Sequence, residues 1–296
     1  MTQPRRIPAI VYLLIAFTAS RAAYMLMGVS FDASSLPSSW HILDVAHLQN
    51  DLLSSLYWLH SQPPGFNLLI GAVLQVAGDQ FSILLAALYW LTGFGIYYLV
   101  YRILRLSGTG YWPAFLLATL FIIFPERILY ENWLFTTWLI SGLITFAAYA
   151  LWKYQAGGKR RYLTGFLAAV TLICLSRSMF LIVYLLVSIA LLFFCFYPSK
   201  VRFIAYVSLL ATALVLLLYL KNFALFGFFG PSSWTGMNLW RIASRVVSVE
   251  EKAMLVEAGD IPATALVTEF HPVADYAPEL IQVPRLWHRY HFCPTR

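Results

Sequence analysis

The chain has little charge. Only 11% of its 296 residues are Asp, Glu, Lys or Arg, whereas soluble domains carry about 25%, and 60% are hydrophobic with a mean hydropathy of +0.72. This composition excludes an ordinary soluble domain and predicts an all-α polytopic membrane protein. A span needs about 20 apolar residues. We expect seven spans, at about 7–27, 81–101, 107–125, 132–152, 162–176, 178–199 and 203–220.

Cysteine is scarce as well. The three cysteines, with no CxxC spacing, indicate neither a disulfide framework nor a zinc site. There is also no glycine-rich phosphate loop before a basic helix, no HExxH string and no serine elbow. Nucleotide hydrolysis and metalloprotease chemistry therefore have no support in the sequence.

Acids are missing from every second connection between the expected spans. One set of connections is basic throughout, and the alternate set holds all 13 acids; the basic set contains Arg5, Arg6, Arg102, Arg105, Lys153, Lys159, Arg160, Arg161, Lys200 and Arg202. Because Lys and Arg mark cytoplasmic loops, the N-terminus is predicted inside and the acids outside. The net charge of +7 is then explained by cytoplasmic loops beside anionic headgroups, without nucleic acid.

The first span, preceded by Arg5 and Arg6, has some features of a signal peptide. Arg21 within it and the lack of a clean cleavage site favour an uncleaved anchor. We expect a transmembrane domain over 1–220, with a long outer loop at 28–80, and a periplasmic tail over 221–296.

The long outer loop is expected to carry two helices at the membrane surface. Residues 40–59 have the periodicity of an amphipathic interfacial helix. Pro63 or Pro64 then opens a second, apolar helix over 66–77, because proline is favoured in the first turn. That helix is too short to span comfortably, and the charge sorting requires it to stay outside.

Asp44 is the predicted catalytic carboxylate, with His41 and His47 at helical spacing beside it. A carboxylate near apolar surface can act as a general base. The alternative is a solvated polar helix face. Asp32 and Asp51 are weaker candidates for the same role.

The second outer loop holds Glu126, Arg127 and Glu131, and charges beside the membrane are costly unless they pair or bind something. Glu131 is a possible second acid, expected at the start of a helix, where the dipole favours it. An ion pair of Glu126 with Arg127 is the alternative to a functional role for Glu126.

Three cations, Arg21, Arg177 and Lys221, lie near the outer ends of different spans. They are predicted to bind a lipid phosphate; the alternative is snorkelling to headgroups. The string from His60 through Gln62, Pro63 and Pro64 is predicted to position the outer loop, either for chemistry or only as a rigid turn.

The strings LHSQPPGFN, YENWLF, LSRSMF and KNFALFGFFGPSSWTGMNL, with this topology, resemble GT-C glycosyltransferases. The resemblance covers residues 1 to about 245. It is closest to the branch of protein O-mannosyltransferases and aminoarabinose transferases. It implies that Asp44 is the first-loop carboxylate, Glu131 the second-loop acid, and Arg177 and Lys221 phosphate-binding cations. Asp44 is not followed by Glu, as it is in several members, and the family usually has further spans after the seventh.

The resemblance implies an inverting transferase at the periplasmic face of a bacterial inner membrane. It would move a sugar from a polyprenyl-phosphate donor to a glycan, lipid or protein acceptor. Some relatives use a divalent metal, but the acids here are too scattered to predict a metal site. The alternative is a non-catalytic polyprenyl-lipid carrier or an assembly subunit in a cell-envelope glycan pathway.

Overall fold

The structure is a computed structural model that describes residues 8–39, 41–196 and 201–268. Within these residues it is helical, with a single isolated β-bridge between Asp32 and Trp133. The chain divides into two compact units, Met1–Pro231 and Ser232–Arg296. The first unit ends eleven residues after the expected boundary at 220, because α11 continues to Phe226.

The first unit contains eleven α-helices and one short 3-10 helix in its described residues. They are α1 (Ala9–Leu26), α2 (Val45–Asn50), α3 (Leu52–Trp58), α4 (Pro64–Ala77), η1 (Gly78–Gln80), α5 (Phe81–Leu106), α6 (Tyr111–Ile123), α7 (Pro125–Glu131), α8 (Thr136–Gly157), α9 (Arg160–Cys174), α10 (Ile182–Phe196) and α11 (Val201–Phe226). Each of the seven expected spans overlaps one helix of this set, but α6, α9 and α10 have only 13 to 15 residues.

Among the described residues, fewer helices than the seven expected spans are long and apolar enough to be candidate membrane spans. Three helical stretches are long and apolar enough to cross a membrane: Ala9–Leu26, Pro64–Leu106 and Val201–Phe226. A fourth is added if α6 and α7, bent by 61° between them, form one broken span. Helix α9 has only 15 residues and packs between α8 and α11, and α10 is a shorter apolar helix.

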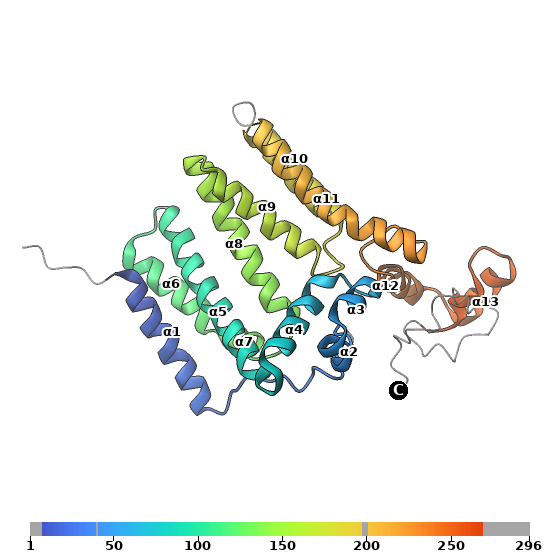
Figure 1. Cartoon of the computed structure of the whole chain (residues 1–296), viewed down its shortest axis with the longest axis horizontal. Coiled ribbons are helices and arrows are strands. Elements are labelled where there is room, and N and C mark those ends of the chain that lie inside the picture. The colour runs from blue at the N-terminus through green and yellow to red at the C-terminus, as the bar shows by residue number, and fades with distance from the viewer. Residues whose placement is uncertain (1–7, 40, 197–200, 269–296) are drawn as a thin grey trace, which may run out of the picture. The chain divides into compact units, whose positions relative to one another are not determined.

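The helices run alternately up and down, as the charge sorting requires. The turns α5–α6 and α8–α9 lie at one end of the unit, and α7 and the segment carrying α2 and α3 lie at the other (Figure 1). The turns at the first end carry basic residues and no acid, and the acids Asp44, Asp51, Glu126 and Glu131 lie at the other end. Which end faces the cytoplasm stays a prediction.

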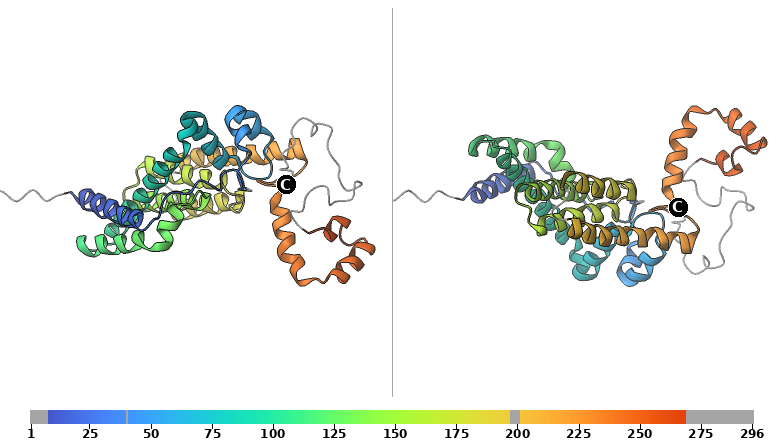
Figure 2. Two further views of the ribbon diagram at one scale, coloured as in Figure 1. Left: turned by 90° about the horizontal axis from the view of Figure 1, so that it is seen from below. Right: turned by 90° about the horizontal axis from the view of Figure 1, so that it is seen from above.

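Two hydrophobic cores hold the first unit together. One joins α1, α4, α5 and α6 through residues such as Leu13, Ile70 and Tyr97, and the other joins α8 to α11 through residues such as Leu167 and Val215. Helix α8 packs on both α5 and α9 and so connects the two. Helices α2 to α4 lie to one side of α8 and α9 (Figure 2).

The outer loop differs from the expected single interfacial helix. Residues 41–59 form two short helices, α2 and α3, separated at Asp51, whose φ of −145° is not helical. Asp44 caps the first of them. Trp40, at the expected helix start, lies outside the described residues. Pro64 opens α4, which confirms the prediction for the Pro-Pro pair.

The second unit contains α12 (Trp234–Ala243), η2 (Ser244–Val246), α13 (Val249–Glu257) and η3 (Ala263–Leu266) in its described residues. Ser248 caps α13 by accepting a hydrogen bond from the Glu251 amide, and Glu250 and Glu251 occupy its first turn, where a carboxylate is favoured. Cys293 and the rest of 269–296 lie outside the described residues.

Candidate functional site

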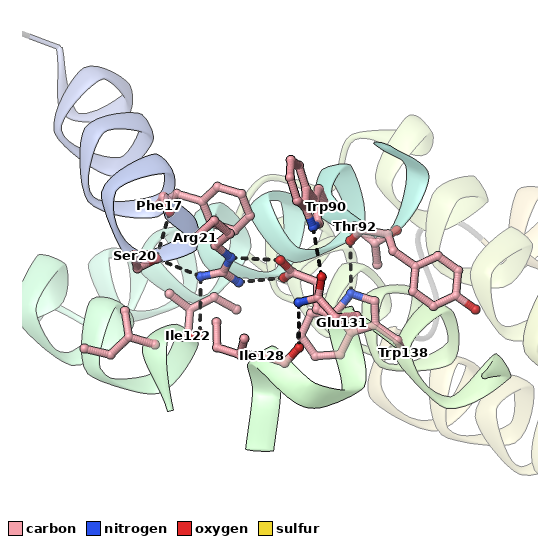
Figure 3. A network of polar contacts seen from close by, with 12 residues as sticks. Phe17, Ser20, Arg21, Trp90, Thr92, Ile122, Ile128, Glu131 and Trp138 are labelled. Atoms are coloured by element: carbon pink, nitrogen blue, oxygen red, sulfur yellow. Dashed lines mark hydrogen bonds and ion pairs between the residues drawn. The ribbon is translucent and has the colours of Figure 1, made fainter. Parts of the chain in front are cut away.

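Arg21 and Glu131 form a buried ion pair (Figure 3). Arg21 Nε donates to Glu131 Oε1 at 2.8 Å and Nη2 to Oε2 at 2.6 Å, and the two side chains are 5% and 0% exposed. The guanidinium also lies 3.9 Å from the centre of the Phe17 ring and donates to Ser20 Oγ at 3.0 Å. The sequence analysis predicted Arg21 as a phosphate-binding cation and Glu131 as a second acid, but in the structure their charges neutralise each other.

The surroundings of Glu131 are built to fit it. Glu131 is the last residue of α7, not the start of a helix as expected, so the dipole there disfavours its charge and Arg21 supplies the compensation. Gly93 of α5 faces the carboxylate so closely that a Cβ at this position would collide with Glu131 Oε2. The pair thus joins α1, α5 and α7 in one packed contact.

The segment after Glu131, residues 132–135, connects the ion pair to the residues around Phe135 by hydrogen bonds to Asp32 and Tyr89. The Asp32 amide donates to the Asn132 carbonyl at 2.7 Å, and the Leu134 amide donates to the Asp32 carbonyl at 3.1 Å. The Tyr89 hydroxyl donates to the Phe135 carbonyl at 3.0 Å. These bonds hold the backbone that leads to and carries the Phe135 ring.

Arg177 lies over that ring, in the turn between α9 and α10. Its guanidinium is 5.2 Å from the centre of Phe135, and Nη1 donates to Thr137 Oγ1 at 2.9 Å. His41 meets the same ring edge-on, with centroids 5.6 Å apart. Burial and, second, the charge of Arg177 lower the pKa of His41, so its imidazole is neutral at pH 7.

Lys221 and His60 form a second basic group. Lys221 Nζ donates to the Leu59 carbonyl at 2.5 Å, and the His60 ring packs 4.5 Å from that of Phe226. Burial, with the nearby Lys221 charge, lowers the pKa of His60 to about 4. The sequence suggested that Lys221 follows the seventh span, which was expected to end at 220. In the structure Lys221 lies within the last turns of α11.

The Pro-Pro loop links the two basic groups. Ser178 Oγ donates to Gln62 Oε1 at 3.4 Å, and the Gly65 amide donates to the Leu175 carbonyl at 2.7 Å. A Cβ on Gly65 would lie 2.6 Å from Ser176 Oγ, so only glycine allows this approach. We call His41, His60, Arg177 and Lys221 the outer cluster.

Asp44 is exposed, and its carboxylate accepts a hydrogen bond from the Ala46 amide at 2.8 Å as the N-cap of α2. The neighbouring segment is fixed by Asn67, which is 1% exposed and bonds the His41 carbonyl and the Leu43 amide. Asp32 and Asp51 are exposed as well. His41, which the sequence supplied only as a neighbour of Asp44, is the residue that packs beside Arg177.

An apolar groove of about 560 Å³ lies between α4, α5, α8 and α9. Its walls include Ala72, Leu88, Ile96, Leu143 and Leu172. One end is formed by Gly65, Thr136 and Ser176, the direct neighbours of the Pro-Pro loop, Thr137 and Arg177. The groove therefore leads from apolar helix surface to the outer cluster.

The sequence did not predict the groove, although small residues at Ala72, Gly95 and Gly142 mark three of its walls. For metals, no group of three or more His, Cys, Asp or Glu comes together among the described residues. No family model, curated protein or solved structure matches the chain.

Proposed function

We propose that the chain is a membrane glycosyltransferase that takes a sugar from a polyprenyl-phosphate donor and passes it to an acceptor on the periplasmic side. The observation that carries this proposal is the apolar groove whose lining includes Thr136 and Ser176, the chain neighbours of Thr137 and Arg177. A lipid phosphate needs these two features together: a dry surface for the isoprenoid chain and a cation for the head.

The remaining topology belongs to the same proposal. In the proposed topology of seven spans with a cytoplasmic N-terminus, the outer cluster faces the periplasm of a bacterial inner membrane. Two cations and two neutral imidazoles then surround the loop at the mouth of the groove. Arg21 is not available for the phosphate in this arrangement, because Glu131 holds it.

The proposed reaction is an inverting displacement. A base takes the proton of an acceptor hydroxyl or amine, whose oxygen or nitrogen forms a bond to the anomeric carbon. The bond from that carbon to the phosphate oxygen breaks, and its electron pair leaves with the lipid phosphate. Arg177 and Lys221 stabilise the charge that develops there.

Asp44 remains the proposed base from the sequence, and the geometry adds His41 as a competitor. His41 packs on Phe135 next to Arg177 and has a lowered pKa, which keeps the imidazole in the unprotonated form that a base needs, whereas Asp44 is exposed and caps a helix. Asp44→Asn and His41→Gln, compared in one transfer assay, decide between them. The variant that loses transfer while it still binds the lipid phosphate identifies the base.

The groove is tested by filling it. Gly95 lines the groove and a Cβ at this position meets nothing within 4 Å, so Gly95→Leu places its side chain at an open point of the groove wall. Gly157→Leu, at the end of α8 with equally open surroundings, is the matched control. With radiolabelled polyprenyl-phosphate sugars in proteoliposomes, we expect transfer to fall for Gly95→Leu only. Equal transfer in both variants would contradict a role for the groove.

The alternative function is a non-catalytic polyprenyl-lipid carrier. It is favoured by one observation: Asp32, Asp44 and Asp51 are exposed, and Glu131 is held in its ion pair. A carrier should bind polyprenyl phosphate and lose this binding in Gly95→Leu, yet give no transfer with any sugar donor.

A further inference from the structure

Helix α12 and the adjoining η2 expose a stripe of large apolar side chains. Leu239, Ile242 and Val246 are 65%, 69% and 87% exposed. Their spacing of three and four residues places them on one face of the helix. The stripe is separate from the outer cluster and from the groove, which belong to the first unit.

The opposite face of α12 already has its packing partner. Met237 and Trp240, also three residues apart, line a hollow with Pro262 and Ala265 in the same unit. The Nζ of Lys252 lies 5.9 Å from the centre of the Trp240 ring. Helix α12 is thus apolar on two faces, and within the described residues the unit covers only one of them.

Charge indicates what covers the other face. Arg241 and Arg245 are exposed, four residues apart, and lie along one side of the stripe. There is no acid between residues 222 and 249, and the next acids are Glu250 and Glu251 of α13. A short helix with an apolar face flanked by arginines is typical of a segment lying in the headgroup region of a bilayer.

The chain also brings this helix close to a membrane. Helix α11, a candidate span, ends at Phe226, and α12 begins at Trp234. Eight Cα steps extend at most about 29 Å. The covalent chain therefore keeps the start of α12 within about 29 Å of the end of α11.

We propose that α12 and η2 lie in the membrane interface at the outer end of α11. Leu239, Ile242 and Val246 contact acyl chains, and Arg241 and Arg245 bind the phosphates of anionic phospholipids. This site does not depend on sugar transfer.

The test uses the full chain in vesicles of phosphatidylcholine with phosphatidylglycerol. Cys174, Cys195 and Cys293 are replaced, and a spin label is placed at Leu239→Cys or Ile242→Cys. Glu257→Cys, on α13 of the same unit, is the control position. We expect the first two labels to be reached by oxygen from the lipid and shielded from a water-soluble nickel complex, and the third to show the reverse.

Labels at 239 and 242 that the nickel complex reaches would overturn the proposal. So would spin–spin broadening at 239 that disappears on dilution with unlabelled protein, because a second copy would then be the occupant. A further outcome is that the labels are shielded from the nickel complex equally in every lipid and in dilute, uncharged detergent micelles. That result would indicate that another part of the same chain covers them, and it would also overturn the proposal.

The arginines give a second, independent readout. Arg241→Gln with Arg245→Gln should move the label at 239 toward water in vesicles that contain phosphatidylglycerol, and should have a smaller effect in pure phosphatidylcholine. Arg161→Gln, an exposed arginine in the basic α8–α9 region, is the control and should leave the label unchanged. An equal shift in both lipids would show that the arginines bind no anionic headgroup.

Discussion

The ion pair of Arg21 with Glu131 and the outer cluster around Arg177 show two ways of placing charge in an apolar protein. In the first, a carboxylate and a guanidinium are brought together, buried, and closed to solvent and ligand. In the second, Arg177 is half-buried against Phe135 and Thr137, and the titratable group packed beside it is a neutral histidine. The compensated pair is suited to hold helices together, and the uncompensated cation is suited to receive an anion.

The largest effect is expected where the closed pair is broken. Glu131→Ala should lower the free energy of unfolding by about 3–5 kcal/mol, because it leaves Arg21 buried without a partner. The measurement is denaturant or thermal unfolding in detergent. The double variant Arg21→Met, Glu131→Met removes both charges and should recover most of the loss. A double variant as unstable as the single one would contradict this account of the pair.

In the outer cluster, by contrast, Arg177→Gln should weaken binding of polyprenyl phosphate and change the free energy of unfolding little. Loss of a charge-assisted hydrogen bond of about 1.5–3 kcal/mol corresponds to roughly a 10- to 100-fold rise in Kd. Titration of the purified protein in nanodiscs measures it, with Arg161→Gln as control. A variant that is less stable but binds polyprenyl phosphate with an unchanged Kd would place Arg177 with the structural charges.

Two glycines of one helix separate packing at the pair from packing at the groove. Gly93→Ala puts a Cβ against Glu131 and should cost about 1–3 kcal/mol of stability through overpacking. Gly95→Ala, two residues along α5 with open space, should be neutral or stabilise by about 0.5–1 kcal/mol, since alanine favours the helix. Similar unfolding curves for the two variants would show that α5 shifts freely at Gly93.

The smallest effect is a pH dependence in the outer cluster. The folded pKa of His60 is about 4, below its ordinary 6.5, so the unfolded chain binds more protons between these values. Stability should therefore fall as the pH is lowered from about 6.5 to about 4, and His60 should contribute nothing above that range. His60→Gln should show a shallower decline in unfolding scans across this window. An unchanged slope would mean that His60 stays solvated.

The positions of the helices followed from the sequence, since uncharged stretches of span length coincide with α1, α5, α6, α8, α9, α10 and α11. The Pro-Pro start of α4 and the opposite placement of acidic and basic turns also followed from local pattern. The interruption at Asp51 did not, because residues 40–59 keep one apolar periodicity across both short helices. The role of Glu131 was missed for a different reason: its partner is 110 residues away.

The sequence by itself determined that the chain is helical, with apolar stretches long enough to cross a membrane and turns that hold basic residues without acids, because hydrophobic length and charge are properties of contiguous residues. Only the tertiary structure decided which charges neutralise one another and which stay open. That choice depends on contacts between residues far apart in the chain. Arg21 pairs with Glu131, whose carboxylate fits against Gly93, whereas Arg177 packs on the same Phe135 ring as a neutral histidine and follows Ser176, which lines a groove between four helices.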